Sequence, residues 1–261
     1  MARPKKELNR ILSADEREIT FEGSVVGSDR ELVSLLLKVA DGERHVKTAC
    51  NLVERFGPLL PSVGEGDGDA RVVPMDVIDN VASFAGYVSR LSLTSMGLDR
   101  DREVVFMSGD GSFRSKVPRL QVDGSVTSKT VTVQGDRQTL VGASSSLLAT
   151  LLNEAQWYRY VPSPSGPPIE TLEAKVLFSV FDAVRNGLLV PCTRCSRPVI
   201  MLGSKGSPFC SKVCGNSFVR ERKRNVALSV LGDCDDVFYA SSVSGLPIGA
   251  VKRLRKRVFD E

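Results

Sequence analysis

The amino-acid sequence predicts an α+β protein: a mixed helical and antiparallel-sheet N-terminal domain followed by a small, treble-clef-like C-terminal zinc module with four cysteine ligands. Three observations support this. Apolar residues recur at helical spacing through most of the first hundred residues, strand-like alternation follows between residues 100 and 143, and four cysteines cluster near the C-terminal end. With 261 residues, 42% of them hydrophobic, the chain can bury one sizeable core and carry a small satellite module.

The N-terminal residues predict a basic arm followed by helices. Residues 1–19 are expected to be flexible, because their basic side chains lie in a stretch without strong apolar periodicity. A helix is expected after Ser28, which forms a capping-box pattern with Glu31. A second should run over residues 43–56, stopped by Gly57 and Pro58. It carries His45, the only histidine, interpreted as a surface or packing residue because no second histidine exists for metal or triad chemistry.

A third helix is expected after Pro74. Its apolar residues follow heptad-like spacing, which predicts a helix in the protein core, with partner-helix dimerisation as the alternative. These residues are Val77, Val81, Phe84, Val88 and Leu91.

Period-two alternation between residues 100 and 143 predicts a small antiparallel meander. Its expected strands are 104–107, 113–117, 120–122, 126–133 and 138–141, separated by Asp-Gly and Gly-Asp dipeptides typical of hairpin turns. Ser144–Ser146 should cap the next helix, which ends in an aromatic cluster containing Trp157, Tyr158 and Tyr160. We interpret this cluster as part of the core, the alternative being a stacking surface for a base or a ligand.

Proline marks the expected boundary between the two parts of the chain. Residues 163–168 contain three prolines and predict a linker, and an amphipathic helix should then run from Ile169 to Gly187 and lead into the first cysteine pair. The predicted organisation is an arm (1–19), an α+β domain of unknown ligand (20–162), the linker (163–168), a buttressing helix with the zinc finger (169–230) and a basic tail (231–261).

Four cysteines have the spacing of a metal site. Cys192-x2-Cys195 and Cys210-x3-Cys214 are separated by fourteen residues, so two tight thiol pairs can converge on one ion when the intervening loop makes a hairpin. Ser211 can cap a helix carrying Cys214 in its first turn. Four thiolates fill a tetrahedron and leave no position for water, so the sequence predicts one structural Zn²⁺.

Disulfides and a redox-active cysteine pair are the alternatives to zinc. The polar start of the chain shows no secretory signal, and no apolar run approaches the ~18 residues of a membrane span, so a reducing cytoplasm is the expected compartment and no membrane partner is expected. A redox-active Cys-x2-Cys needs only its own two cysteines, so the presence of the second pair favours a metal site over redox chemistry.

Basic residues are concentrated around the cysteines. Residues 190–224 contain eight basic residues and one acid, Glu221, whereas residues 1–189 contain 22 basic and 25 acidic residues. Segregated positive charge favours a polyanionic partner, with a merely solvated helix face as the alternative. The expected nucleic-acid contacts lie on the helix after Ser211: Lys212, Asn216, Arg220, Arg222, Lys223 and Arg224. A distal basic cluster from Lys252 to Arg257 would add a second contact.

The stretch Phe209-Cys210-Ser211-Lys212-Val213-Cys214-Gly215-Asn216, followed by Arg220-Glu221-Arg222-Lys223-Arg224, resembles the CGNR zinc finger. The resemblance covers about residues 188–226 and implies a DNA-binding module of bacterial transcription regulators. This chain departs from the pattern at Ser217, where the family has its name-giving arginine, and in the tighter spacing of the first cysteine pair.

The predicted function is zinc-dependent nucleic-acid binding, with DNA favoured over RNA and transcription regulation as the expected role. No Walker, Rossmann or Gly-x-Ser-x-Gly motif is present in the sequence, so we expect no enzyme. The alternative is a zinc-stabilised module for protein interaction or ligand sensing, in which the N-terminal domain binds a protein or a small ligand.

Overall fold

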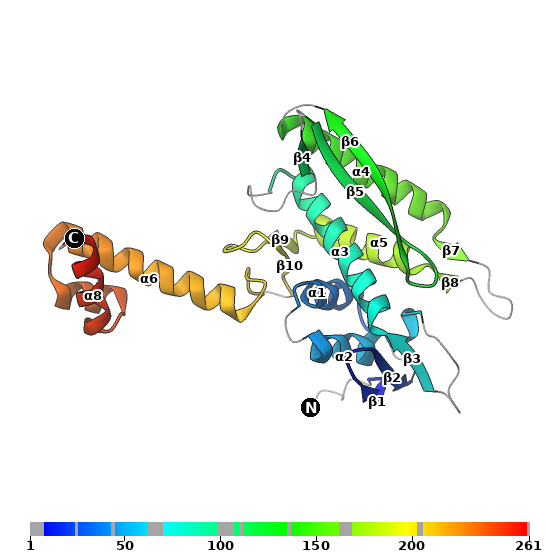
Figure 1. The fold of residues 1–261 in the computed structure, drawn as a ribbon, viewed down its shortest axis with the longest axis horizontal. Coiled ribbons are helices and arrows are strands. Elements are labelled where there is room, and N and C mark those ends of the chain that lie inside the picture. Colours follow the sequence, from blue (N-terminus) through cyan, green and yellow to red (C-terminus); the bar gives the residue numbers. More distant parts are fainter. Residues whose placement is uncertain are drawn as a thin grey trace. The chain divides into compact units, whose positions relative to one another are not determined.

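A computed structural model describes residues 8–23, 26–42, 45–61, 70–98, 107–109, 112–134, 137–161, 169–202 and 206–259 (Figure 1). It combines helices with antiparallel sheets, as predicted. The chain divides into two units: Met1–Cys192 with Ser196–Pro208, and Thr193–Cys195 with Phe209–Glu261. In the part of the chain that the structure describes, no helix is both long and apolar enough to cross a membrane.

The first unit begins with a three-stranded antiparallel sheet of β1 (Arg10–Ala14), β2 (Glu18–Glu22) and β3 (Ala70–Pro74), in the order β1-β2-β3. The prediction of a flexible arm over residues 1–19 is therefore wrong where β1 and the start of β2 lie, and residues 1–7 lie outside the described part. Alternation of apolar and polar residues explains strand β2, because Ile19 and Phe21 are fully buried while their neighbours in the strand are more exposed. Asp15 closes the turn by accepting from the Arg17 and Glu18 amides (2.7 and 2.9 Å).

The α-helices described in the first unit are α1 (Asp29–Ala40), α2 (His45–Phe56), α3 (Met75–Ser95), α4 (Arg137–Trp157) and α5 (Leu172–Arg185). The short 3-10 helix η1 (Gly57–Leu59) follows α2. The expected helices after Ser28, over 43–56 and after Pro74 are confirmed. Ser28 is the N-cap of α1, but its side chain makes no capping hydrogen bond. Glu31 instead accepts from Arg55 of α2 (3.1 Å), so this pair links two helices where a capping box was expected.

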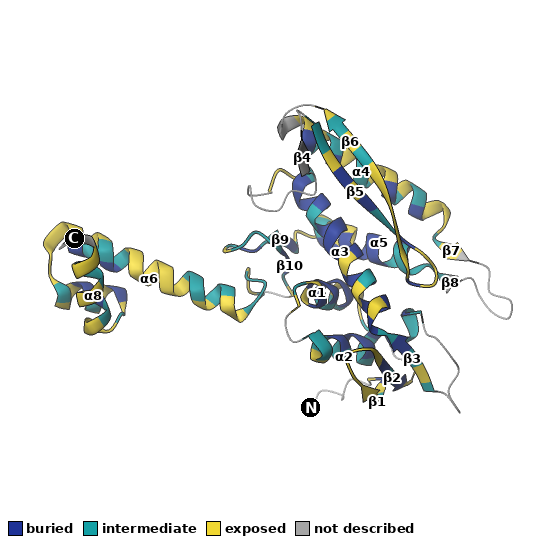
Figure 2. Ribbon diagram, viewed as in Figure 1, coloured by how far each residue is buried: buried dark blue, intermediate teal, exposed yellow. Residues whose placement is uncertain are grey.

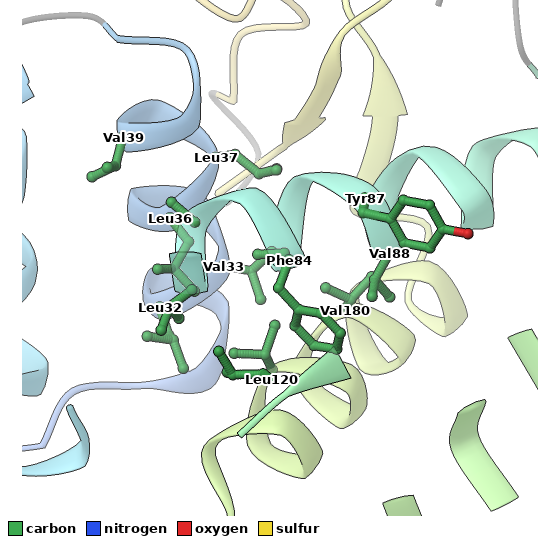
Figure 3. Packing of buried hydrophobic residues seen from close by; sticks show 14 of the residues in the cluster. Leu32, Val33, Leu36, Leu37, Val39, Phe84, Tyr87, Val88, Leu120 and Val180 are labelled. Atoms are coloured by element: carbon green, nitrogen blue, oxygen red, sulfur yellow. The ribbon is translucent and has the colours of Figure 1, made fainter. Parts of the chain in front are cut away.

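The core of the first unit forms between α1, α3 and α5 (Figure 3). The heptad-like residues of α3 are buried, which confirms their interpretation as core. Figure 3 shows Phe84 of α3 between Val33 of α1 and Val180 of α5, with Val88 of α3 near Val180. Figure 2 shows the resulting pattern, with buried residues concentrated on α1 and α3. Burial of this many large apolar side chains is the main stabilising contribution to such a unit.

An antiparallel sheet is present as β4 (Met107–Gly109), β5 (Ser112–Leu120) and β6 (Val126–Gln134). The separate strands expected over 113–117 and 120–122 are wrong in detail, because β5 continues from Ser112 to Leu120 along its full-length pairing with β6. The Asp123-Gly124 turn is confirmed: Gly124 has φ +80° and the Ser125 amide donates to Asp123 Oδ1 (2.9 Å). The Asp110-Gly111 and Gly135-Asp136 dipeptides lie outside the described residues. The prediction of a strand over 138–141 is wrong, because these residues lie in the first turns of α4, where Leu140 is buried with Leu151.

The aromatic cluster at the end of α4 is exposed, contrary to the expected core position. Trp157 is 86% and Tyr158 70% exposed. The last buried residues of α4 are Leu151 and Ala155. The aromatic residues are exposed because they lie beyond this last turn that packs on the core. Arg159 lies 4.6 Å from the ring centroid of Phe178, so the cation contacts an aromatic ring of α5.

The helix α5 belongs to the first unit. Val176, Leu177 and Val180 are fully or almost fully buried in the core with α1 and α3, so the division into units falls after α5 and not at the expected linker. The linker itself, residues 163–168, lies outside the described residues. It is flanked by the short paired strands β7 (Tyr160–Val161) and β8 (Ile169–Glu170). Thr171 caps α5 by accepting from the Ala174 amide (3.4 Å).

The second unit contains α6 (Lys212–Cys234), α7 (Val237–Ser244) and α8 (Ile248–Phe259). Residues 231–261, expected to be a basic tail, therefore complete α6 and form two further packed helices, with residues 260–261 outside the described part. A separate small core explains this, since Ala227 and Leu231 of α6 are buried with Ala240 of α7 and Val251 of α8.

Candidate metal centre and basic helix

A short hairpin carries the first cysteine pair. β9 (Leu189–Pro191) and β10 (Pro198–Ile200) pair antiparallel, and the turn between them is closed by hydrogen bonds of Cys192. The Cys192 amide donates to the Arg197 carbonyl (2.7 Å), and its carbonyl accepts from the Ser196 amide (2.9 Å). Ser196 adopts the left-handed conformation (φ 64°) that lets the chain reverse so tightly.

The second cysteine pair lies at the start of α6. Ser211 is the N-cap and its Oγ accepts from the Cys214 amide (3.2 Å), which confirms the expected cap. Phe209 packs on Phe218 with ring centroids 5.2 Å apart. This aromatic contact fixes the segment that carries Cys210 against the helix that carries Cys214.

The four cysteines come together as their spacing predicts. The Sγ atoms of Cys192, Cys195, Cys210 and Cys214 all lie within 4.8 Å of one another. Two of the separations are 3.4 Å (Cys195 to Cys210) and 3.5 Å (Cys210 to Cys214). Thiolates at the Zn–S distance in a tetrahedron are about 3.8 Å apart. The geometry thus fits four thiolates around one metal ion.

All six expected nucleic-acid contacts are exposed on α6, whose ribbon in Figure 2 is largely in the colour of exposed residues. They are Lys212, Asn216, Arg220, Arg222, Lys223 and Arg224. The structure divides the arginine-rich segment among different sides of the helix. Arg220 and Arg224 line one hollow together with Arg194, whereas Arg222 lines a second. Lys223 donates to the Gly245 carbonyl (3.3 Å) and serves the packing of α6 on the turn between α7 and α8.

Arg194 is the residue of this surface that sequence reasoning did not single out. It lies between the first two cysteines, forms an ion pair with Glu221 of α6 and lines both hollows. Glu221 is the only acid among residues 190–224, so this pair balances the one negative side chain in the segment. The sequence could have pointed to Arg194, because this residue lies between Cys192 and Cys195 and two candidate metal ligands would fix the backbone on either side of it.

Replacing Ser211 with alanine should destabilise the second unit by about 1 kcal/mol, because the Cys214 amide loses its acceptor. Thermal unfolding of α6, followed by hydrogen exchange or circular dichroism of the full chain, measures this. Ser229→Ala is the matched control, since Ser229 is exposed within the same helix. Alanine is the better helix former there, so the control should be neutral or slightly stabilising. Equal effects of the two substitutions would contradict a capping role for Ser211.

Comparison of the chain with protein-family models, with curated proteins and with solved structures finds no match. The residues themselves therefore describe the protein: four cysteines that could hold one metal ion lie next to the start of a long helix rich in basic residues.

Proposed function

We propose that the chain binds nucleic acid, with duplex DNA as the preferred partner, through a zinc-held basic surface on α6. The observation that carries the proposal is the position of Arg194, Arg220 and Arg224 around one hollow of α6. Guanidinium groups bind phosphate oxygens in bidentate fashion and are the usual choice for nucleic-acid backbones. Glu221 also lines this hollow and pairs with Arg194, so three guanidinium groups against one carboxylate leave it with a net positive charge that favours a phosphate.

Zinc has a structural role in this proposal. Four thiolates complete its tetrahedron, so the ion would fix the hairpin knuckle and the start of α6 and would activate no water. The arrangement of a hairpin knuckle followed by a helix that carries the second cysteine pair supports a treble-clef-like module. It also supports the CGNR resemblance, in which a regulator of transcription uses such a module on DNA. We propose no catalytic role for the chain.

A second candidate role concerns the first unit. Trp157 and Tyr158 are largely exposed next to each other at the end of α4. Neighbouring exposed aromatic side chains favour contact with a protein or a small ligand. If the first unit carries the binding function, a metal ion at the four cysteines would only stabilise the fold of the second unit. The two roles are compatible in one chain, but only the first predicts nucleic acid on the second unit.

Crosslinking in cells separates these roles. Irradiation followed by denaturing purification of the full chain should recover covalently bound nucleic acid, and mass spectrometry of the crosslinked peptides should place the adducts within residues 193–195 or 212–234. Adducts that are sensitive to deoxyribonuclease support DNA as the partner. Recovery of protein partners alone, without nucleic acid, would contradict the proposal and favour the interaction role.

A further inference from the structure

The C-terminal part of the second unit is a three-helix cluster with its own core. The end of α6, α7 and α8 meet around Ala227, Leu231, Ala240 and Val251, and no member of this set is more than 2% exposed. The small side chain of Ala240 allows α7 to approach its neighbours closely. Only three residues, 245–247, connect α7 to α8.

The turn between α7 and α8 is tightly defined. Gly245 has φ +65°, a left-handed conformation that favours glycine, and its amide donates to the Ser241 carbonyl (3.0 Å). Ser241 Oγ donates to the Leu246 carbonyl (2.6 Å), and Leu246 packs on the small core. The Pro247 carbonyl then accepts from the Val251 amide (3.2 Å) and starts α8. These bonds fix the angle between the two helices.

The helix α8 has one buried side and one basic side. Val251 is fully buried and Leu254 partly buried against α6 and α7. The opposite side presents small or basic residues, all exposed, and residues 248–257 contain no acid. The exposed residues are Gly249, Lys252, Arg253, Lys256 and Arg257.

One contact near the start of α7 holds α8 in its orientation, and a second caps α7 itself. Arg255 donates from Nε and Nη2 to the two carboxylate oxygens of Asp235 (both 2.6 Å), and these hydrogen bonds lower the pKa of that carboxyl. Asp236 caps α7 by accepting from the Phe238 and Tyr239 amides (2.8 and 3.0 Å). The basic side of α8 is thus presented by a positioned helix.

We propose that α6, α7 and α8 form a helix-turn-helix unit in which α8 enters the major groove of duplex DNA. A helix, a short turn containing glycine and a second helix with an exposed polar side are the parts of that motif, and the second helix reads base edges from its N-terminal half. Lys252 and Arg253 occupy this half, and their donors match guanine O6 and N7. The inference builds on nucleic-acid binding as the proposed function but assigns a separate surface and a separate task, sequence discrimination.

The test compares binding to a selected and a scrambled duplex. The zinc-loaded full chain is used to enrich duplexes from a random pool, and the affinities of the best duplex and of its scrambled version are then measured. Lys252→Ala/Arg253→Ala should lower the ratio of these affinities by about tenfold or more, since each lost base contact removes discrimination. Arg10→Ala/Arg71→Ala, which removes equal charge from exposed positions of the first unit, should keep the ratio.

Contact of α8 with the major groove is tested by a second binding experiment. Replacing the purines of the selected duplex with 7-deazapurines removes the N7 acceptors and should weaken binding of the parent by about tenfold, while a minor-groove ligand should not compete. An unchanged affinity for the deazapurine duplex would overturn the assignment of α8 to the major groove.

The outcomes for the two surfaces are distinguishable. An α8 variant that keeps the parent's affinity ratio overturns this inference, even if Arg220→Glu/Arg224→Glu weakens binding to both duplexes. Loss of discrimination in the α8 variant, with full binding by the α6 variant, supports α8 and contradicts the proposed role of α6. A parent that enriches no duplex sequence, or prefers single strands, overturns the helix-turn-helix assignment.

Discussion

Removing the metal ion is expected to unfold the second unit and to leave the first unit folded. Among the residues whose burial the structure describes, the fully buried core of α6, α7 and α8 consists of four small or medium side chains, whereas the first unit buries a large apolar cluster drawn from α1 to α5 and from three sheets. Units with so little core need a metal or another crosslink, and a structural zinc contributes on the order of 10 kcal/mol of folding free energy. Purified protein should contain one zinc per chain.

Hydrogen exchange of the full chain gives the measurement. After chelation, or in Cys214→Ser, the amides of α6 (Lys212–Cys234) should exchange at rates close to those of an unfolded chain, while those of α3 (Met75–Ser95) remain protected. Cys234→Ser is the matched control, because this exposed cysteine lies at the end of the same helix and outside the four-thiol cluster. A zinc-free chain in which α6 keeps its protection would contradict a folding role for the metal.

Reversing the charge of Arg220 and Arg224 should lower affinity for nucleic acid by about fiftyfold or more at 0.1 M salt. Each neutralised phosphate contributes a factor of about 8 at this salt concentration through counterion release, and two glutamates add repulsion. The loss should be similar for all sequences, because phosphate contacts position a protein without specifying bases. Equilibrium binding of Arg220→Glu/Arg224→Glu to selected and scrambled duplexes measures it.

The control for this substitution changes net charge equally at a distant site. Arg10→Glu/Arg71→Glu places the same four-unit change on exposed strand positions of the first unit and should reduce affinity far less. Unchanged zinc content and circular dichroism should show that the α6 variant is folded. If both variants bind equally well, α6 presents only a solvated face and the interaction role is favoured.

The convergence of the four cysteines and most helices could be predicted from the sequence because short-range patterns determine them. The two cysteine pairs have a spacing that is specific for a shared ion, and Ser211 caps α6 as its neighbourhood predicts. The stripe from Val77 to Leu91 is similarly strong, since its helical period continues over several turns. In each case the residues that interact are close in sequence or repeat regularly.

The features that were missed depend on contacts between distant segments. β1 is a strand because it pairs with β2, and its own residues show little apolar periodicity. The start of α4 contains the β-branched residues Thr139 and Val141, which favour a strand, but packing of Leu140 in a continuous helix overrides this preference. The last thirty residues contain a run of basic side chains over 252–257, and only the buried residues that meet around Ala240 and Val251 show that this segment folds. Composition alone therefore predicted a tail where the structure has two helices.

The salt dependence of binding tests the central claim most directly. The dissociation constant of the zinc-loaded full chain for a duplex should be measured between 50 and 200 mM salt. If the basic side chains of α6 neutralise about four phosphates, the slope of log affinity against log salt should be near −3.6, which corresponds to roughly a hundredfold loss of affinity. Absence of duplex binding, or a slope near zero, would contradict the account.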